Sequence, residues 1–268
     1  MKQNTLNKIL AVLIVIGIFG YENYLNSEED LHYIETGKTF KKHTNSYYLP
    51  ISSTGQIVHH QNYSLSYSEP HEQAEWVSYE LKVSHLSAAN FQRPYFQIDK
   101  AVKTGAAHWR NYKNSGYDKG HLCPAGDRRF TKEAHDETFL TSNISPQEHE
   151  FNAGVWNRLE QKVRYWANKN DGVYVVTGGI LTQGLKTIGN EAVAVPQQFY
   201  KIILDQTNGN YKVIAFLLDH KDSDLPLYTF VVSVDEVESL TGIDFFPNLE
   251  DTLENKLEAS KSYKDWSF

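Results

Sequence analysis

The sequence has 268 residues, of which 40% are hydrophobic and 22% are charged, and its formal net charge at pH 7 is −7. This composition is that of an ordinary globular protein and excludes a chain that is disordered over most of its length. The acidic total weighs against a polyanionic partner, although the field at a binding site is set by local charges.

The N-terminus has the pattern of a targeting segment. Lys2 and Lys8 precede an apolar run at residues 9–20, and the chain then turns polar. A basic start and about a dozen apolar residues are typical of a signal peptide, and the run is short for a membrane span of about 20 residues. No A-x-A cleavage site is present, so an uncleaved anchor stays open. We expect residues 1–20 to be a signal peptide or membrane anchor and the protein to be exported, either periplasmic or extracellular.

The rest of the chain reads as one domain. Beyond residue 30 there is no Gly/Ser-rich or Pro-rich linker, no repeat and no low-complexity tract. We expect an N-terminal extension over residues 21–55, one domain over 56–255 and a C-terminal tail over 256–268. Cys123 is the only cysteine, so no intramolecular disulfide is possible, and we expect a buried or inert thiol.

Short elements precede the centre of the domain. Alternating apolar and polar residues predict a strand at 74–81. Extended pieces punctuated by Pro and Gly are predicted at 93–99, 115–124 and 140–147. Thr131 and Glu133 signal the start of a short helix over 131–139.

The strongest predicted helix runs from Asn152 to Asn168. Its apolar positions recur at helical spacing and form one stripe, made of Val155, Leu159, Val163 and Trp166. Asn152, Trp156 and Glu160 form a neighbouring stripe, which in an arbitrary helix would be a polar shoulder beside the core face.

The remaining elements are mostly strands. They are predicted at 173–181, 197–205, 211–220 and 228–234, with an Asn-Gly hairpin signal between the second and third. Ser233 and Glu236 have capping-box spacing at the start of a helix that Gly242 ends. Strands dominate, helices are inserted and βαβ alternation is absent, so the fold class is α+β with a mixed or antiparallel sheet.

Basic residues gather in the middle of this acidic chain. Residues 93–132 contain nine lysines and arginines against three aspartates, a local excess of +6. Such a segment is compatible with a phosphate-bearing substrate, although a solvated mixed-charge surface would give the same count.

Three motifs carry a resemblance. "DKGHLCPAGDRRF", "ETFLTSNISPQ" and "FNAGVWNRLE" follow one another at spacings that closely resemble the DNA/RNA non-specific endonuclease family. The likeness covers roughly residues 60–250. It implies a ββα-metal (His-Me finger) site and a Mg²⁺-dependent endonuclease that cleaves DNA and RNA, with Mn²⁺ or Ca²⁺ as possible substitutes and no nucleotide cofactor.

The resemblance also implies roles for individual residues. His121 would be the general base, Asn152 the direct metal ligand, and Glu160 a metal ligand through water. Asn143 would organise the site, and Arg93 would stabilise the phosphate in the transition state. Further site residues are Asp118 and Lys119, and phosphate contacts are expected from Lys119, Arg128 and Arg129.

Two points depart from a simple transfer of the family pattern. Lys119 stands where the family usually has arginine, so the bidentate guanidinium fork is lost while the charge is kept. Eight residues of straight helix would also place Asn152 and Glu160 about 12 Å apart along the axis. We therefore expect an irregular first turn at Ala153 and Gly154.

Two other functions stay open on the sequence alone. The acidic total would suit a metal-dependent phosphodiesterase or phosphatase that acts on small nucleotides. A non-catalytic module that kept the fold and binds nucleic acid is the second, although the intact set of His121, Asn152 and Glu160 argues against it. DNA and RNA partners would be bound mainly through backbone phosphates, and a tether at the N-terminus and the oligomeric state are left open.

Overall fold

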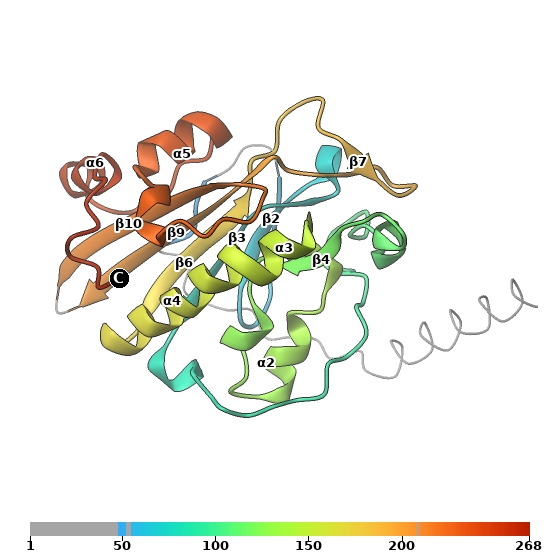
Figure 1. Ribbon diagram of the computed structural model, residues 1–268, viewed down its shortest axis with the longest axis horizontal. Helices are drawn as coiled ribbons and strands as arrows, with labels where there is room; N and C mark the ends of the chain where they lie inside the picture. The colour runs from blue at the N-terminus through green and yellow to red at the C-terminus, as the bar shows by residue number, and fades with distance from the viewer. Residues whose placement is uncertain (1–47, 52–54, 208) are drawn as a thin grey trace, which may run out of the picture. The chain divides into compact units, whose positions relative to one another are not determined.

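The computed structural model describes residues 48–51, 55–207 and 209–268. Within them, seven strands form one antiparallel sheet in the order β1-β2-β3-β6-β9-β10-β11 (Figure 1). The strands are β1 (Gln56–His59), β2 (Ser64–Ser68), β3 (Gln73–Leu81), β6 (Val173–Gly179), β9 (Gln198–Thr207), β10 (Asn210–Asp219) and β11 (Val231–Val232). The α+β class with an antiparallel sheet is confirmed.

Helices cover both faces of this sheet (Figure 1). Successive side chains of a strand point to opposite faces, so each face has its own apolar cluster. On one face the sheet packs against α4 (Asn157–Lys169), and on the other against α5 (Val234–Thr241) and α6 (Asp251–Glu258). The apolar stripe predicted for the long helix is confirmed, because all four of its residues are buried in the first cluster.

Local capping signals set several helix ends as predicted. The Thr131 side chain accepts a hydrogen bond of 3.1 Å from the Ala134 amide at the start of α2 (Lys132–Glu137). Ser233 does the same for the Glu236 amide at 3.2 Å in α5, and Gly242 ends that helix with φ of 70°. These contacts satisfy amides that have no partner within the helix.

The predicted strand at 228–234 is wrong over its first half. Leu227–Phe230 forms a 3₁₀ turn in which the Thr229 amide donates to the Pro226 carbonyl at 3.0 Å. Only Val231 and Val232 pair with β10. Pro226 fixes the backbone at the start of a turn, and this outweighs the strand preference of the apolar residues after it.

The chain ends pack onto the domain where they are described. Ile51, from the predicted extension, pairs with Asp244 through a hydrogen bond of 2.9 Å. In the predicted tail, Trp266 is buried and the Trp166 indole of α4 donates to the Ser267 carbonyl at 2.9 Å. The targeting segment predicted at residues 1–20 lies outside the described residues. No helix in the described ranges has the length and apolar character of a membrane span.

Candidate active site

A small hairpin and the helix after it bring the predicted site residues together. β4 (Asp118–His121) pairs antiparallel with β5 (Ile144–Gln147), and α3 (His149–Phe151) follows directly. These strands and the helical segment that continues into α4 form a ββα unit beside the main sheet (Figure 1). In β4 the side chains alternate, so Lys119 and His121 share one face of the hairpin.

The helix of this unit has an irregular first part. Residues 152–156 form a π-helical stretch between α3 and α4, in which Gly154 has φ of −94° and ψ of −110°. The Val155 amide donates to Asp222 Oδ1 at 2.8 Å. A Cβ on Gly154 would lie 2.2 Å from that oxygen, so only glycine fits here without a shift. The irregular turn predicted at Ala153 and Gly154 is confirmed.

A cleft of about 680 Å³ opens beside the ββα unit. His121, Asn152 and Glu160 all line it. Its remaining polar and charged lining residues include Arg129, Asn157, Arg164 and Asn168. The three residues that lie far apart in the motifs therefore face one space.

His121 is held as a neutral imidazole. Its ring centroid lies 4.9 Å from that of Phe139 and 5.5 Å from that of Phe96. Burial, followed by the charge of Arg93, lowers the pKa of His121 to about 3. Its Nε2 atom is buried and has no hydrogen-bond partner in the described part of the chain. The ring is thus unprotonated at neutral pH, and it is held by two aromatic rings and not by a hydrogen bond to Nε2.

Asp118 fixes the orientation of Asn152. The Asn152 Nδ2 donates to Asp118 Oδ2 at 3.0 Å, and His149 Nδ1 lies 3.0 Å from the same oxygen. A carboxylate only accepts hydrogen bonds, so it selects the amide nitrogen of Asn152 and leaves the amide oxygen for another partner. An oxygen at this place suits a hard divalent cation.

Glu160 belongs to a buried charge network that the sequence did not reveal. Burial raises the pKa of Glu160 to about 7, although Lys201 and Arg164 act in the opposite direction. Arg164 Nη2 lies 3.4 Å from Glu160 Oε2, and Arg164 Nε lies 2.5 Å from Asp127 Oδ1. The spacing of Glu160 and Arg164 indicates an i,i+4 pair, but the contact with Asp127 depends on the tertiary fold.

The donor set of the cleft fits a divalent cation. Asn152 offers a neutral amide oxygen and Glu160 a carboxylate, and both line the same space. A hard cation that keeps several waters needs only one or two protein oxygens. The raised pKa of Glu160 shows that the positive charges around it do not fully offset its burial. A bound cation would favour the ionised form of this carboxylate.

Two cations lie close to the Phe96 ring, which itself contacts His121. The Arg93 guanidinium carbon is 5.6 Å from the centre of the Phe96 ring, and Lys119 Nζ is 5.4 Å from it. Burial, followed by the charge of Arg93, lowers the pKa of Lys119. Two neighbouring positive charges repel each other, and an anion bound between them would remove that repulsion.

The side chain of Asn143 forms hydrogen bonds with backbone groups, some of them close to His121 in the sequence. It is fully buried, its oxygen accepts from the Cys123 amide at 2.8 Å, and its nitrogen donates to the Cys123 and Thr138 carbonyls at 2.9 Å each. It therefore positions the chain that leaves β4. The buried thiol predicted for Cys123 is confirmed, and burial raises its pKa to about 12.

The prediction that Arg128 contacts a phosphate is wrong. It is 1% exposed, and its guanidinium donates to the carbonyls of Asn62 at 2.9 Å and Glu80 at 3.1 Å. The five donors of a guanidinium make it suited to capping several carbonyls at once. Arg129, its neighbour in the sequence, instead lines the cleft.

Comparisons with known proteins agree with this geometry. A family model described as DNA/RNA non-specific endonuclease matches residues 41–252. The chain is 34% identical to "Nuclease EXOG, mitochondrial" of Danio rerio, over 87% of this chain and 72% of that protein. It is 34% identical to "Nuclease" of Nostoc sp. over 73% and 76% of the two chains, and 30% identical to human "Endonuclease G, mitochondrial" over 72% and 70%. A crystal structure of the EndoG/EndoGI complex superposes with a TM-score of 0.68 at 29% identity, covering 75% of this chain and 89% of that one.

Proposed function

The chain belongs to the DNA/RNA non-specific endonuclease family, and we propose that it is a Mg²⁺-dependent endonuclease in which His121 is the general base. Family membership and the nucleases among its relatives make it a hydrolase that acts on DNA and RNA. The observation that carries the assignment of the base is the neutral, unpartnered imidazole in the same cleft as Asn152 and Glu160.

His121 accepts the proton of the attacking water. A neutral imidazole is a suitable base, and general base catalysis typically contributes a factor of about 10² to 10⁴ in rate. Because Nε2 is buried, we assign the proton transfer to Nδ1. Phe96 and Phe139 hold the ring in place, and Asn143 holds the backbone that follows it.

Asn152 and Glu160 would hold the divalent cation, Asn152 directly and Glu160 through a water. When bound, the cation supplies positive charge to the phosphate oxygens as negative charge develops on them. Asp118 keeps the Asn152 oxygen available by accepting from its nitrogen. Arg164, which also lines the cleft, forms an ion pair with the Glu160 carboxylate.

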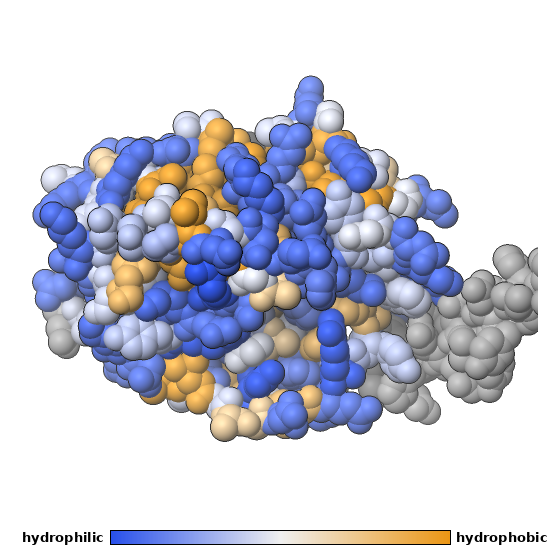
Figure 2. Space-filling model, in the orientation of Figure 1, coloured by the Kyte–Doolittle hydropathy of each residue, from blue (hydrophilic) through white to orange (hydrophobic). Residues whose placement is uncertain are grey.

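Arg93 and Lys119, with Arg129 in the cleft, would bind the substrate phosphates. Hydrophilic residues cover most of the face on which α3 and α4 lie, and apolar residues form separate patches there (Figure 2). Contacts of this kind go to the sugar-phosphate backbone and read little of the base sequence. DNA and RNA binding is therefore weakly sequence-dependent and strongly salt-dependent.

A plasmid-nicking assay tests the assignment. His121→Ala should lower kcat by a factor of about 10² to 10⁴, or roughly 3 to 5 kcal/mol of barrier. EDTA should abolish cleavage by the parent chain, and Mg²⁺ should restore it more effectively than Ca²⁺. His71→Ala, which removes a half-buried histidine outside the cleft, is the matched control.

Three results would contradict the proposal. Cleavage by His121→Ala at the parental rate would show that the base is elsewhere. Faster turnover of a small chromogenic phosphodiester than of long DNA would favour a small-nucleotide phosphodiesterase. DNA retention without metal-stimulated cleavage would favour a binding module.

We also propose that residues 1–20 direct export and that the apolar run at 9–20 can tether the protein when it is not cleaved. The support is the basic start, the apolar run and its length. Expression of the full chain, followed by cell fractionation and N-terminal sequencing, tests this. Recovery of the protein in the cytosol with its N-terminus intact would refute it.

A further inference from the structure

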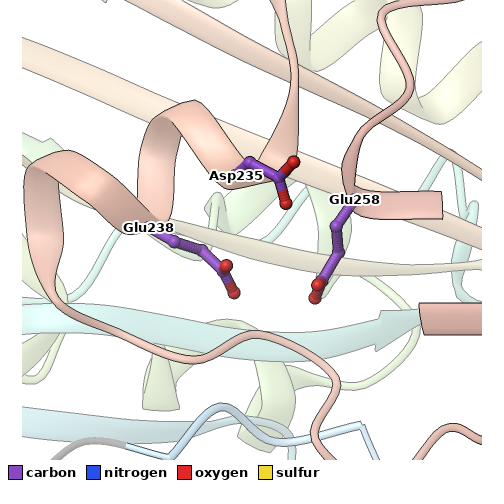
Figure 3. Close-up of side chains that lie close together, drawn as sticks. All are labelled: Asp235, Glu238 and Glu258. Atoms are coloured by element: carbon purple, nitrogen blue, oxygen red, sulfur yellow. The ribbon is translucent and has the colours of Figure 1, made fainter. Parts of the chain in front are cut away.

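A cluster of five carboxylates lies between α5 and α6, on the sheet face opposite α4. Asp235 and Glu238 belong to α5, Asp244 to the connection after it, and Glu254 and Glu258 to α6. One oxygen each from Asp235, Glu238 and Glu258 lies within 4.8 Å of the others, and the same holds for Asp244, Glu254 and Glu258. Figure 3 shows the carboxylates of Glu238 and Glu258 pointing into one space beside Asp235.

Glu258 distinguishes this cluster from an ordinary acidic surface. Glu258 is only 8% exposed, and its Oε1 is buried without a hydrogen-bond partner among the described residues. Oε1 of Glu254 is buried and unpartnered in the same way. A buried carboxylate without a partner is costly, so these atoms indicate a missing ligand.

No cation of the described residues compensates the cluster. None of the five carboxylates forms an ion pair with a lysine or arginine there, and the nearby Lys261 pairs with Glu236 instead, at 2.7 Å. Burial, followed by the charges of Glu238 and Glu254, raises the pKa of Glu258 to about 8. The fold thus holds these carboxylates close together although their negative charges repel one another.

We propose that these carboxylates bind a calcium ion that links α5 to α6. Ca²⁺ takes six to eight oxygen ligands at about 2.3 to 2.6 Å, so oxygens on opposite sides of the ion lie about 4.8 Å apart. Glu258 is shared by both groups and is the central ligand, and waters complete the shell. Mg²⁺ fits less well, because it usually binds through one or two carboxylates and keeps several waters.

The site is independent of the nuclease cleft. Glu160 lies on α4, whereas α5 and α6 pack on the other face of the sheet. The expected effect of calcium is therefore on stability, because the ion bridges two helices that otherwise repel each other through this cluster. Binding to the folded state alone raises Tm in proportion to the logarithm of the calcium concentration above the dissociation constant.

Calcium titration of the full chain carrying Asn152→Ala tests the proposal without interference from the nuclease cleft. Calorimetry should show one site with a dissociation constant on the order of 10⁻⁴ M. Melting should show Tm raised by several degrees in millimolar CaCl₂ relative to EDTA, and by clearly less in MgCl₂.

Variants decide which residues bind. Glu238→Gln combined with Glu258→Gln should abolish the calcium-dependent rise in Tm, and Glu236→Gln, an equal charge change outside the cluster, should keep it. The double variant should melt in EDTA no lower than its parent, because amides remove the repulsion. Asp235→Asn is a milder second variant that should weaken calcium binding. Absence of the Tm rise in the parent, its persistence in the double variant, or an equal effect of Mg²⁺ would overturn the proposal.

Discussion

At the scale of residues, the environment of each titratable group decides what it can do. His121 and Lys119 follow each other closely in β4, yet one is a neutral acceptor and the other a cation on the Phe96 ring. Arg128 and Arg129 are adjacent in sequence, yet one is buried against backbone carbonyls and the other lines the cleft. Residue type alone predicts neither outcome, because both depend on packing partners that are distant in sequence.

The depressed pKa of His121 predicts an acid-dependent loss of stability. The folded pKa is about 3, whereas the unfolded value is about 6.5, so the unfolded chain binds more protons between these values. The contribution of this site is fully present above the unfolded pKa and is lost as pH falls towards the folded one. By one-site linkage the loss from pH 7 to pH 5 is up to about 2 kcal/mol.

Replacing His121 by Asn isolates this contribution from those of Glu160 and Glu258, whose raised pKa values act in the opposite sense. Urea unfolding of the parent and the variant at pH 7 and pH 5 provides the measurement. The variant should lose less stability on acidification. Equal losses in the two proteins would mean that His121 titrates normally in the folded state.

Lys119 predicts a change in salt dependence. If it neutralises one substrate phosphate, Lys119→Ala should reduce the slope of log affinity against log salt by about 1. Lys119→Arg should keep the slope, because the charge is kept. Binding of double-stranded DNA to His121→Ala over a range of NaCl concentrations measures the slope. An unchanged slope for Lys119→Ala would remove this residue from the phosphate-binding set.

At the scale of elements, an irregular stretch separates α3 from α4, and Asn152 at its start and Glu160 beyond its end line the same cleft. In a straight helix Asn152 and Glu160 would be about 12 Å apart along the axis. The π-helical stretch at 152–156, anchored by Asp222, changes this first part of the segment. The geometry of the cleft therefore depends on a contact between the ββα unit and the loop after β10.

Gly154→Ala should disturb this break. The new Cβ would lie 2.2 Å from Asp222 Oδ1, and overpacking of this kind costs typically about 1 to 3 kcal/mol. We expect a lower Tm and a lower kcat. Ala153→Gly, in the same turn, is the control. In the background of Asp222→Gly, which removes the clashing oxygen, Gly154→Ala should cost less stability than in the parent. An equal cost in the two backgrounds would show that the backbone dihedral angles of Gly154 are the main constraint.

At the scale of the whole molecule, an acidic protein gathers basic residues at the cleft that we propose binds the substrate. The net charge is −7, yet Arg93, Lys119 and Arg129 lie beside or in the cleft, while the carboxylates of α5 and α6 lie on the opposite face of the sheet. Total charge therefore gives a poor account of the partner of this protein.

The C-terminal residues belong to the same folded unit. Trp266 is 3% exposed, and its ring centroid lies 4.9 Å from that of Trp166. Trp266→Ala should destabilise the domain by about 3 to 5 kcal/mol, because a large buried side chain is removed. The value of kcat below the melting transition should be unchanged, since the residue is outside the cleft. Chemical unfolding and a plasmid assay of Trp266→Ala test whether 256–268 is a dispensable tail. Tyr263→Ala, which truncates an exposed side chain in the same segment, is the control.

The sequence by itself determined the fold class, most of the strands, the capped helices and the three ordered motifs, because these depend on short-range periodicity, turn residues and spacing. Together with the family resemblance, it also led us to expect an irregular turn at Ala153 and Gly154. The tertiary structure decided which side chains meet: Asp118 with Asn152, Asp127 with Arg164, Asp222 with Val155, and Arg128 with carbonyls far along the chain. Burial and hydrogen bonding between distant residues set these pairs, and no local pattern encodes them.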